Sequence, residues 1–473
     1  MIRRTVYALV ALLLTCGSVG QAFAAAPPDP TADTTRRMIL VTFSNEPSQV
    51  AGRAGSTGRR YTGNGYTVAQ IAHKQAQRVA QAYSLHEVAS WPIRALSVHC
   101  VVYEVTDNRS LAMLLATLAK DPEVKLAQPL QQFHTLTQAD TAAPTAPTAA
   151  GAAPTSAPAA SATAPTALTA APPAADPTAP GPSQYNDPLY DLQTNLAALE
   201  IPRAHLRSEG AGVRVGLIDT GVDTSHPDLH NRISGTHSYI SNSGGAGSYR
   251  HGTAMAGVIA AAANNRVGIV GIAPLAKVEV FEACWQLEPN ADAAACNTFT
   301  LAQAISAALD AHLPLINLSI AGPADPLLSA LVETGLRRGV VFVGAASESA
   351  DSFPTGIPGV ISVGASERNA GTSEVTAPGN HVMTLRPKAQ YDFDSGTSIA
   401  TAEISGVVAL LLANSPHLSA ASIESLLTQT STHDGLVKTS DALGKAGVVD
   451  ANAALVKLRE LRGQRVATRS AVD

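Results

Sequence analysis

The chain has 473 residues, with 32 Lys and Arg against 37 Asp and Glu, which gives a formal net charge of −5. This length exceeds one ordinary domain and suits two domains, or one large domain with attachments. Nucleic acid is not expected as the main partner, because phosphate binding needs clustered Lys and Arg and the chain has no basic block.

The first 24 residues have the three parts of a secretory signal peptide. Arg3 and Arg4 give a positive start, residues 6–14 are apolar, and residues 22–24 (Ala-Phe-Ala) provide small residues for cleavage. The apolar run is too short to span a bilayer, and no membrane span is expected further along the chain. We therefore predict export, to the periplasm or out of the cell. Lipid anchoring at Cys16 is an alternative, although Thr15 is an awkward neighbour for it.

Residues 36–136 are expected to form a small α+β domain. The predicted order of elements is β-α-β-β-α-β, which is the ferredoxin-like, split βαβ arrangement. Strands are predicted at residues 38–44, 94–96, 98–105 and 124–133, and helices at residues 67–84 and 110–119. Cys100 falls in an apolar strand and is expected to be a small buried hydrophobe.

Residues 139–183 are expected to be an extended, disordered linker. They contain 19 Ala, 10 Pro and 8 Thr in 45 positions, so they offer almost nothing to bury, and Pro blocks both helix and sheet.

Strands and helices alternate through residues 185–455, which indicates an α/β domain with a mainly parallel sheet covered by helices on both faces. Strands are predicted at residues 213–218, 278–281, 315–319, 340–343 and 360–363, and helices at residues 257–263, 301–311, 327–338 and 398–413. The basic tail, residues 456–473, is either a solvated helix or a contact surface.

Three short stretches of this domain supply the groups that acyl transfer requires. Asp219 ends a predicted strand, His251 opens an Ala-rich helix in His-Gly-Thr, and Ser398 opens the long helix in Gly-Thr-Ser-Ile-Ala. Such a reaction needs a hydroxyl nucleophile, a base that takes its proton, and a carboxylate that holds the base in the right tautomer. Each group alone has a common structural explanation, since an Asp after a strand often only caps the next turn and a Ser or Thr often only caps a helix.

Together the three stretches resemble the signature motifs of the subtilisin-like serine proteases, the subtilases, over residues 185–455. The resemblance implies that Asp219 orients, His251 is the general base and Ser398 is the nucleophile. It implies a serine endopeptidase that hydrolyses peptide bonds of protein or peptide substrates. It also implies that residues 36–136 are a propeptide that blocks the cleft with its last strand, and that maturation cuts fall in the linker.

Several residues depart from the family pattern. Ser347 stands where an Asn usually donates to the oxyanion, which predicts a slow enzyme and leaves open an inactive pseudoprotease that serves as a secreted binding module. The resemblance places the substrate pocket at Ser319, Ile320, Ala321 and Ala346. Ala321 and Ala346 add methyl groups there, so a preference for small residues is expected. Glu403 is expected to bring negative charge near His251 and to raise its pKa.

In an exported protein, Cys284 and Cys296 are expected to form a disulfide across an irregular loop, with two buried free thiols as the alternative. No cofactor is expected to be required. Asn264 and Asn265, with Asp228, resemble a calcium-binding loop of the family, although an Asn-rich turn is an equal alternative and calcium needs six to eight oxygens. His226 and His237 lack metal-ligand spacing and are expected at the surface.

Overall fold

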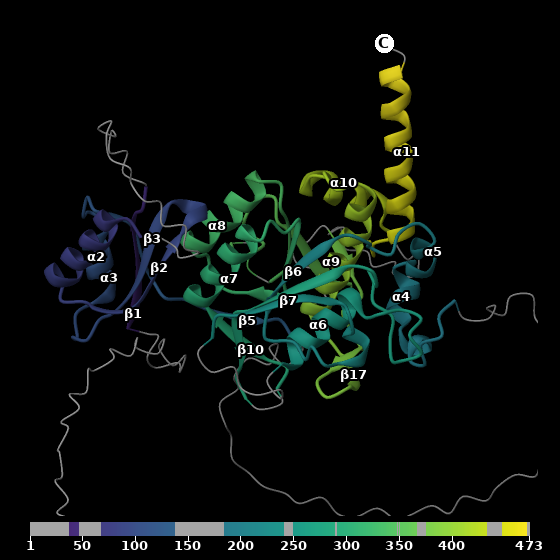
Figure 1. Cartoon of the computed structure of the whole chain (residues 1–473), viewed down its shortest axis with the longest axis horizontal. Helices are drawn as coiled ribbons and strands as arrows, with labels where there is room; N and C mark the ends of the chain where they lie inside the picture. Colours follow the sequence, from purple (N-terminus) through teal and green to yellow (C-terminus); the bar gives the residue numbers. More distant parts are fainter. Residues whose placement is uncertain are drawn as a thin grey trace, which may run out of the picture.

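A computed structural model describes residues 37–46, 68–137, 184–240, 249–288, 291–347, 349, 351–366, 375–432 and 447–470. The expected signal peptide and the linker at residues 139–183 lie outside these ranges. The described part comprises an N-terminal α+β domain and a larger α/β domain packed against it (Figure 1).

The N-terminal domain has the predicted ferredoxin-like fold. Its sheet has the order β2-β3-β1-β4 with antiparallel neighbours, and two helices cover one face. The elements are β1 (Met38–Ser44), α2 (Gln70–Ala82), β2 (His86–Ile93), β3 (Val98–Glu104), α3 (Leu111–Leu118) and β4 (Val124–Pro129). Cys100 on β3 is free and buried, as expected.

Two predicted strands of this domain differ from the structure. Residues 94–96 form a 3-10 turn, η1 (Arg94–Leu96), and the strand β2 lies before it. The chain reverses here through Ser97 in a left-handed conformation with φ of 54°. Residues 124–133 form two strands, because after Pro129 the chain leaves β1 and begins β5 (Gln132–Thr135), whose partners belong to the large domain.

The large domain is built on a parallel sheet of order β15-β14-β13-β11-β6-β8-β7, as predicted. These strands are β6 (Arg214–Asp219), β7 (Ile233–Ser238), β8 (Lys277–Glu282), β11 (Leu315–Leu318), β13 (Val341–Ala345), β14 (Ile361–Ala365) and β15 (Val375–Ala377). One apolar core packs α6 (Arg250–Ala260) and α9 (Thr397–Asn414) on one face of the sheet. A second core packs α7 (Thr298–Asp310) and α8 (Pro326–Arg337) on the other.

The remaining elements of the large domain lie around this core. They are η3 (Tyr190–Leu192), α4 (Thr194–Ala198), α5 (Ile201–His205), η4 (Pro227–Leu229), the hairpin β16 (Val382–Arg386) and β17 (Gln390–Asp394), α10 (Ala420–Thr430) and α11 (Ala451–Ser470). The tail is therefore helical to Ser470, and α11 projects away from the domain in Figure 1.

Helix α9 has the length and apolar composition of a membrane span. Within the described residues it is the one such helix, and 89% of the apolar window is buried inside the protein. This helix is therefore the central core helix of the domain. Its apolar composition follows from its packing against α6 and the sheet.

A small second sheet of order β12-β5-β10-β9 joins the two domains. Strand β5 of the N-terminal segment lies between β10 (Ala294–Asn297) and β12 (Ile320–Ala321) and runs antiparallel to both. The outer strand is β9 (Cys284–Gln286), and the disulfide between Cys284 and Cys296 links it to β10 with a Cα–Cα distance of 4.3 Å.

The N-terminal domain also covers the starts of α7 and α8. Gln128 Nε2 donates to Asp325 Oδ2 at 2.8 Å, and Gln128 Oε1 accepts from the Leu327 N–H at 3.1 Å. Trp91 meets Phe299 edge to face at a centroid distance of 4.8 Å. These contacts satisfy backbone groups that a helix start leaves open, and they fix where β5 enters the large domain.

Candidate active site

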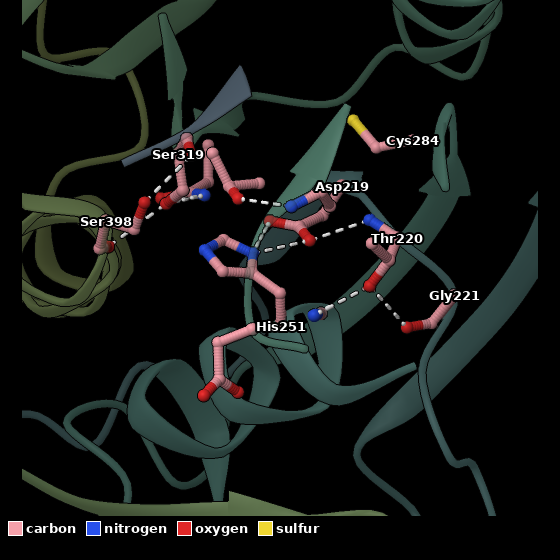
Figure 2. Close-up of polar contacts among 12 residues, drawn as sticks. Asp219, Thr220, Gly221, His251, Cys284, Ser319 and Ser398 are labelled. Atoms are coloured by element: carbon pink, nitrogen blue, oxygen red, sulfur yellow. Dashed lines mark hydrogen bonds and ion pairs between the residues drawn. The ribbon is translucent and has the colours of Figure 1, made fainter. Parts of the chain in front are cut away.

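Asp219 and His251 meet at the carboxyl end of β6. His251 Nδ1 lies 2.8 Å from Asp219 Oδ1 and 2.9 Å from Asp219 Oδ2, and both side chains are fully buried (Figure 2). Asp219 Oδ1 also accepts the Thr220 N–H at 2.6 Å. The carboxylate therefore holds Nδ1 as the protonated nitrogen and leaves Nε2 free to act as a base.

Small residues allow this close approach of α6 to β6. Gly252 N–H donates to Thr220 Oγ1 at 2.9 Å, and a Cβ on Gly252 would lie 2.6 Å from the carbonyl oxygens of Thr220 and Gly221. Any side chain at Gly252 would push His251 away from Asp219. The glycine of the His-Gly-Thr motif is thus a packing requirement of the pair.

The environment of His251 raises its pKa above the ordinary value. Burial alone would lower the pKa, because it disfavours the imidazolium, but the charge and hydrogen bond of Asp219 outweigh it. Asp394 and Asp292 add further negative charge. Glu403, which was expected to have this effect, is not among these groups, and its Oε1 accepts from Asn195 Nδ2 at 2.7 Å.

Ser398 is placed in the first turn of α9, close to His251 in Figure 2. Its Oγ donates to the Ser319 carbonyl oxygen at 3.0 Å, and Ser319 Oγ donates back to the Ser398 carbonyl oxygen at 3.1 Å. His251 Nε2 is buried and has no hydrogen-bond partner among the described atoms. The hydroxyl is therefore held by Ser319 and not yet by the base.

A buried polar chain supports Ser319. Asn317 Nδ2 donates to Ser319 Oγ at 2.9 Å, and Asn317 Oδ1 accepts from Ser405 Oγ at 2.8 Å. Asn317 lies on β11 and Ser405 on α9, and both are fully buried. The two hydrogen bonds lock the strand that ends at Ser319 to the helix that carries Ser398. A polar pair inside otherwise apolar runs was the only available signal.

The end of β5 reaches this site directly. The Leu136 N–H donates to Ser398 Oγ at 3.0 Å, and the Leu136 carbonyl oxygen accepts from the Ser398 N–H at 3.3 Å. A Cβ on Gly396 would lie 2.3 Å from that same carbonyl oxygen. The chain thus presents the carbonyl group of Leu136 to a backbone donor beside the Ser398 hydroxyl.

Ser347 does not contribute a donor to the Leu136 carbonyl oxygen. Its Oγ donates to the Ser349 carbonyl oxygen at 3.3 Å and shares a short hydrogen bond with Ser352 Oγ. Among the described groups, the Ser398 N–H is the hydrogen-bond donor found at that oxygen. That a hydroxyl at this position is too short for the role of the usual Asn stays a prediction.

The segment predicted to bind substrate contains a short strand, β12, that pairs with β5. The backbone of Ile320 pairs with Thr135 and that of Ala321 pairs with His134, while the Ile320 side chain is buried in the core. A cavity of about 830 Å³ opens beside Leu136. It is lined by His134, Leu136, Leu287, Ala321, Gly322, Pro323, Ala324, Ser347, Ser349, Asp351 and Ser352.

This cavity argues against the expected restriction to small residues. Leu136 already lies at its edge, and the cavity is several times larger than a small side chain needs. Ala346 is not among the lining residues, and its N–H instead donates to the Val363 carbonyl oxygen at 2.8 Å. The methyl group at this position therefore does not narrow the cavity.

The loop around Asn264 and Asn265 does not fit a calcium site. Asn265 Oδ1 accepts the Val267 N–H at 2.8 Å, which turns its Nδ2 to donate to Asp228 Oδ1, also at 2.8 Å. Asp228 Oδ2 accepts the Ile269 N–H at 2.9 Å. Both carboxylate oxygens face donors, whereas calcium would need them to face the ion. Nor do the described residues hold a group of three or more His, Cys, Asp or Glu suited to a metal.

His226 is not at the surface, contrary to expectation. It is 1% exposed, accepts the Asp228 N–H on Nδ1 at 3.2 Å, and packs edge to face on Tyr391 at 5.2 Å. The sequence offers no sign of this, because its partner in β17 lies far along the chain.

The chain is similar in sequence and fold to known proteins. The subtilase family model matches residues 210–450, half of the chain, and the chain belongs to the subtilase family. Subtilisin DY of Bacillus licheniformis is 32% identical over 249 residues, which are 48% of this chain and 86% of the relative. Thermitase of Thermoactinomyces vulgaris is 31% identical over 242 residues, 48% of this chain and 84% of the relative.

Solved structures agree on the fold. A protease from Pseudoalteromonas arctica matches with a TM-score of 0.51 and 25% identity, over 58% of this chain and all of that one. Fervidolysin from Fervidobacterium pennivorans, described as keratinolytic and related to subtilisin, matches with a TM-score of 0.62 and 21% identity, over 89% of this chain and 60% of its own. The protein is a subtilisin-like serine endopeptidase.

Proposed function

We propose that this endopeptidase is exported as a precursor, that it uses Asp219, His251 and Ser398 as its catalytic triad, and that residues 36–136 are its inhibitory propeptide. The supporting observation is the placement of the Leu136 carbonyl oxygen on the Ser398 N–H at 3.3 Å. That is where a substrate carbonyl must sit for attack by Ser398, with a donor ready for the developing oxyanion.

The chemistry follows from this placement. The Ser398 hydroxyl first turns from the Ser319 carbonyl oxygen to His251 Nε2. Oγ then attacks the Leu136 carbonyl carbon while Nε2 takes its proton, and Asp219 stabilises the imidazolium. The C–N bond to Thr137 breaks as Nε2 returns the proton to the leaving amine, which leaves an ester between Leu136 and Ser398. Water, deprotonated by His251, hydrolyses that ester.

The N-terminal segment fits the role of a propeptide because its last strand binds as a substrate would. Strand β5 adds to β10 and β12 through backbone pairing, so the large domain supplies both flanking strands. Thr135 is fully buried and its Oγ1 accepts the Ala294 N–H at 3.0 Å. The first cut is then at the bond between Leu136 and Thr137, just before the linker where cuts were expected.

Expression of the full chain tests this proposal. We expect the wild-type chain to yield a mature protein whose N-terminal sequence starts at Thr137, and Ser398→Ala to remain an uncut precursor. A fluorophosphonate should label the mature wild-type enzyme and not Ser398→Ala. A mature chain that starts elsewhere would refute the assigned bond.

The same labelling separates the endopeptidase from a pseudoprotease, the alternative favoured by the position of Ser347. An uncut wild-type precursor that a fluorophosphonate does not label would show that the fold has kept binding without turnover. Export is tested by fractionation, with the mature protein expected outside the cytoplasm and Arg3 and Arg4 required for it.

A further inference from the structure

The cavity beside Leu136 has one apolar wall and one polar wall. Residues 321–324 and Leu287 form the apolar side, and Ser347, Ser349, Asp351 and Ser352 form the polar side. An apolar pocket with a few polar groups is the usual form of a specificity site, in which the polar groups select among side chains of similar size.

The cavity extends beyond what Leu136 needs. Alternate residues of an extended strand point to the same side, and both Leu136 and His134 border the cavity whereas Thr135 does not. Leu136 and Ser347, which follows β13, both line the cavity, so the cavity receives the side chain that precedes the scissile bond. With about 830 Å³ available, a side chain longer than Leu can lie there.

Asp351 gives the polar wall its charge. Among the described residues that line the cavity, it alone carries a permanent charge, and its side chain is exposed at the rim. The serines behind it are already engaged with one another, since Ser352 Oγ donates to the Ser349 carbonyl oxygen at 2.8 Å and also bonds to Ser347 Oγ. The carboxylate is therefore the lining group available to pair with a charged substrate side chain.

We propose that this cavity makes the enzyme prefer Lys or Arg immediately before the scissile bond, with Asp351 as the residue that determines the preference. The proposal rests on the proposed function. A long basic side chain lays its methylene stem along Ala321 and Gly322 and carries its charged end to the rim, which matches the position of Asp351. The Leu136 side chain is apolar and needs only the apolar wall. The bond after Leu136 lies in the same chain as the active site, so its cleavage does not depend on a charged side chain for binding.

The decisive comparison uses the mature wild-type enzyme and four peptides that differ at one position, occupied by Arg, citrulline, Leu or Glu. Citrulline matches Arg in shape but has no charge. We expect kcat/KM for Arg to exceed that for citrulline by about 1.4-fold to fivefold, the range for an exposed ion pair, and Glu to be the poorest. High salt should reduce the ratio of Arg to citrulline.

Variants assign the effect to Asp351. Asp351→Asn should bring the ratio of Arg to citrulline close to one, and Asp351→Glu should retain the preference. Asp191→Asn, the same change at an exposed acid of η3 outside the cavity, should leave the ratio unchanged.

Two failures are distinct. Equal cleavage of Arg and citrulline by an enzyme that cleaves the Leu peptide overturns the role of Asp351 and leaves the triad standing. Cleavage of none of the four peptides, with no fluorophosphonate labelling, overturns the proposed function and this preference together.

Discussion

The active site has two walls whose polar groups are arranged to different degrees. The base wall holds Asp219 and His251, and the oxyanion wall holds the Ser398 N–H and Ser347. On one wall, Asp219 binds His251 through both oxygens and accepts the Thr220 N–H, so the base is fully oriented. On the other wall, the Leu136 carbonyl oxygen has the Ser398 N–H, while Ser347 turns away to Ser352.

This difference separates two contributions to acyl transfer that are usually found together. Orientation of the base determines whether the hydroxyl can be deprotonated, and donors at the carbonyl oxygen determine how well the tetrahedral intermediate is stabilised. In the proposed triad the first is complete, whereas among the described groups the second comes from the Ser398 N–H and the positive end of α9.

The largest effect on kcat is expected when the base wall is altered at Asp219. Asp219→Asn keeps the shape of the side chain but favours the wrong tautomer of His251, so kcat should fall about 10⁴-fold, as it does in another serine protease. Peptide hydrolysis by the purified mature enzyme measures this. Asp191→Asn, the same exchange at an exposed acid of η3 outside the site, serves as the matched control. A loss below about tenfold would show that Asp219 does not orient the base.

At the oxyanion wall, a further hydrogen-bond donor should increase kcat. Ser347→Asn introduces a longer carboxamide donor at this position, and loss of such a donor in a subtilisin costs about 10²–10³-fold in kcat. We expect a gain in kcat toward that size, with Ser347→Ala close to wild type because Ser347 donates elsewhere. If Ser347→Ala were as slow as a donor deletion, the serine would already serve the oxyanion.

The residues of the site also differ in how well the sequence predicts them. Asp219, His251 and Ser398 lie in short motifs, because glycines such as Gly252 are required within a few residues of them. The parallel sheet and the general plan of the ferredoxin-like domain followed from the order of predicted strands and helices, although β2 lies before the residues where its strand was predicted. Asn317 and Ser405, by contrast, lie in separate elements, and nothing in a linear pattern joins β11 to α9.

The division of β4 and β5 was hidden for the same reason. Both strands are apolar and extended, but β4 pairs with β1 whereas β5 pairs with β10 and β12. Periodicity reports that a residue is extended and not which strand accepts it. The partner is set by contacts such as Gln131 N–H to Thr298 Oγ1 at 3.0 Å, across more than a hundred residues of sequence.

The pH dependence should report the charges behind His251. Because the net pKa of His251 is raised, kcat/KM should fall on acidification at a higher pH than an ordinary imidazole would give, since the imidazolium cannot accept the Ser398 proton. Asp394→Asn removes one charge that raises this pKa, so the acidic limb should move to lower pH. Measurement of kcat/KM across pH for both enzymes tests the direction. A shift of the limb to higher pH would contradict it.

The smallest effect is expected from chelation, on the wall that holds His251. Helix α6 leads into the loop where Asn264 and Asn265 donate their N–H groups to Asp187 at 2.8 and 3.2 Å, and where Asn265 and Ile269 occupy both oxygens of Asp228. We propose that these hydrogen bonds close the loop without a cation, so EDTA should change the Tm of Ser398→Ala by less than about 1 °C. Asp187→Ala should lower the Tm by several degrees, because it leaves two backbone donors without acceptors, at a cost of about 1–3 kcal/mol. A large fall in Tm with EDTA, restored by calcium, would contradict this proposal. It would mean that the loop binds an ion and that the ion-bound loop is more stable than the hydrogen-bonded one.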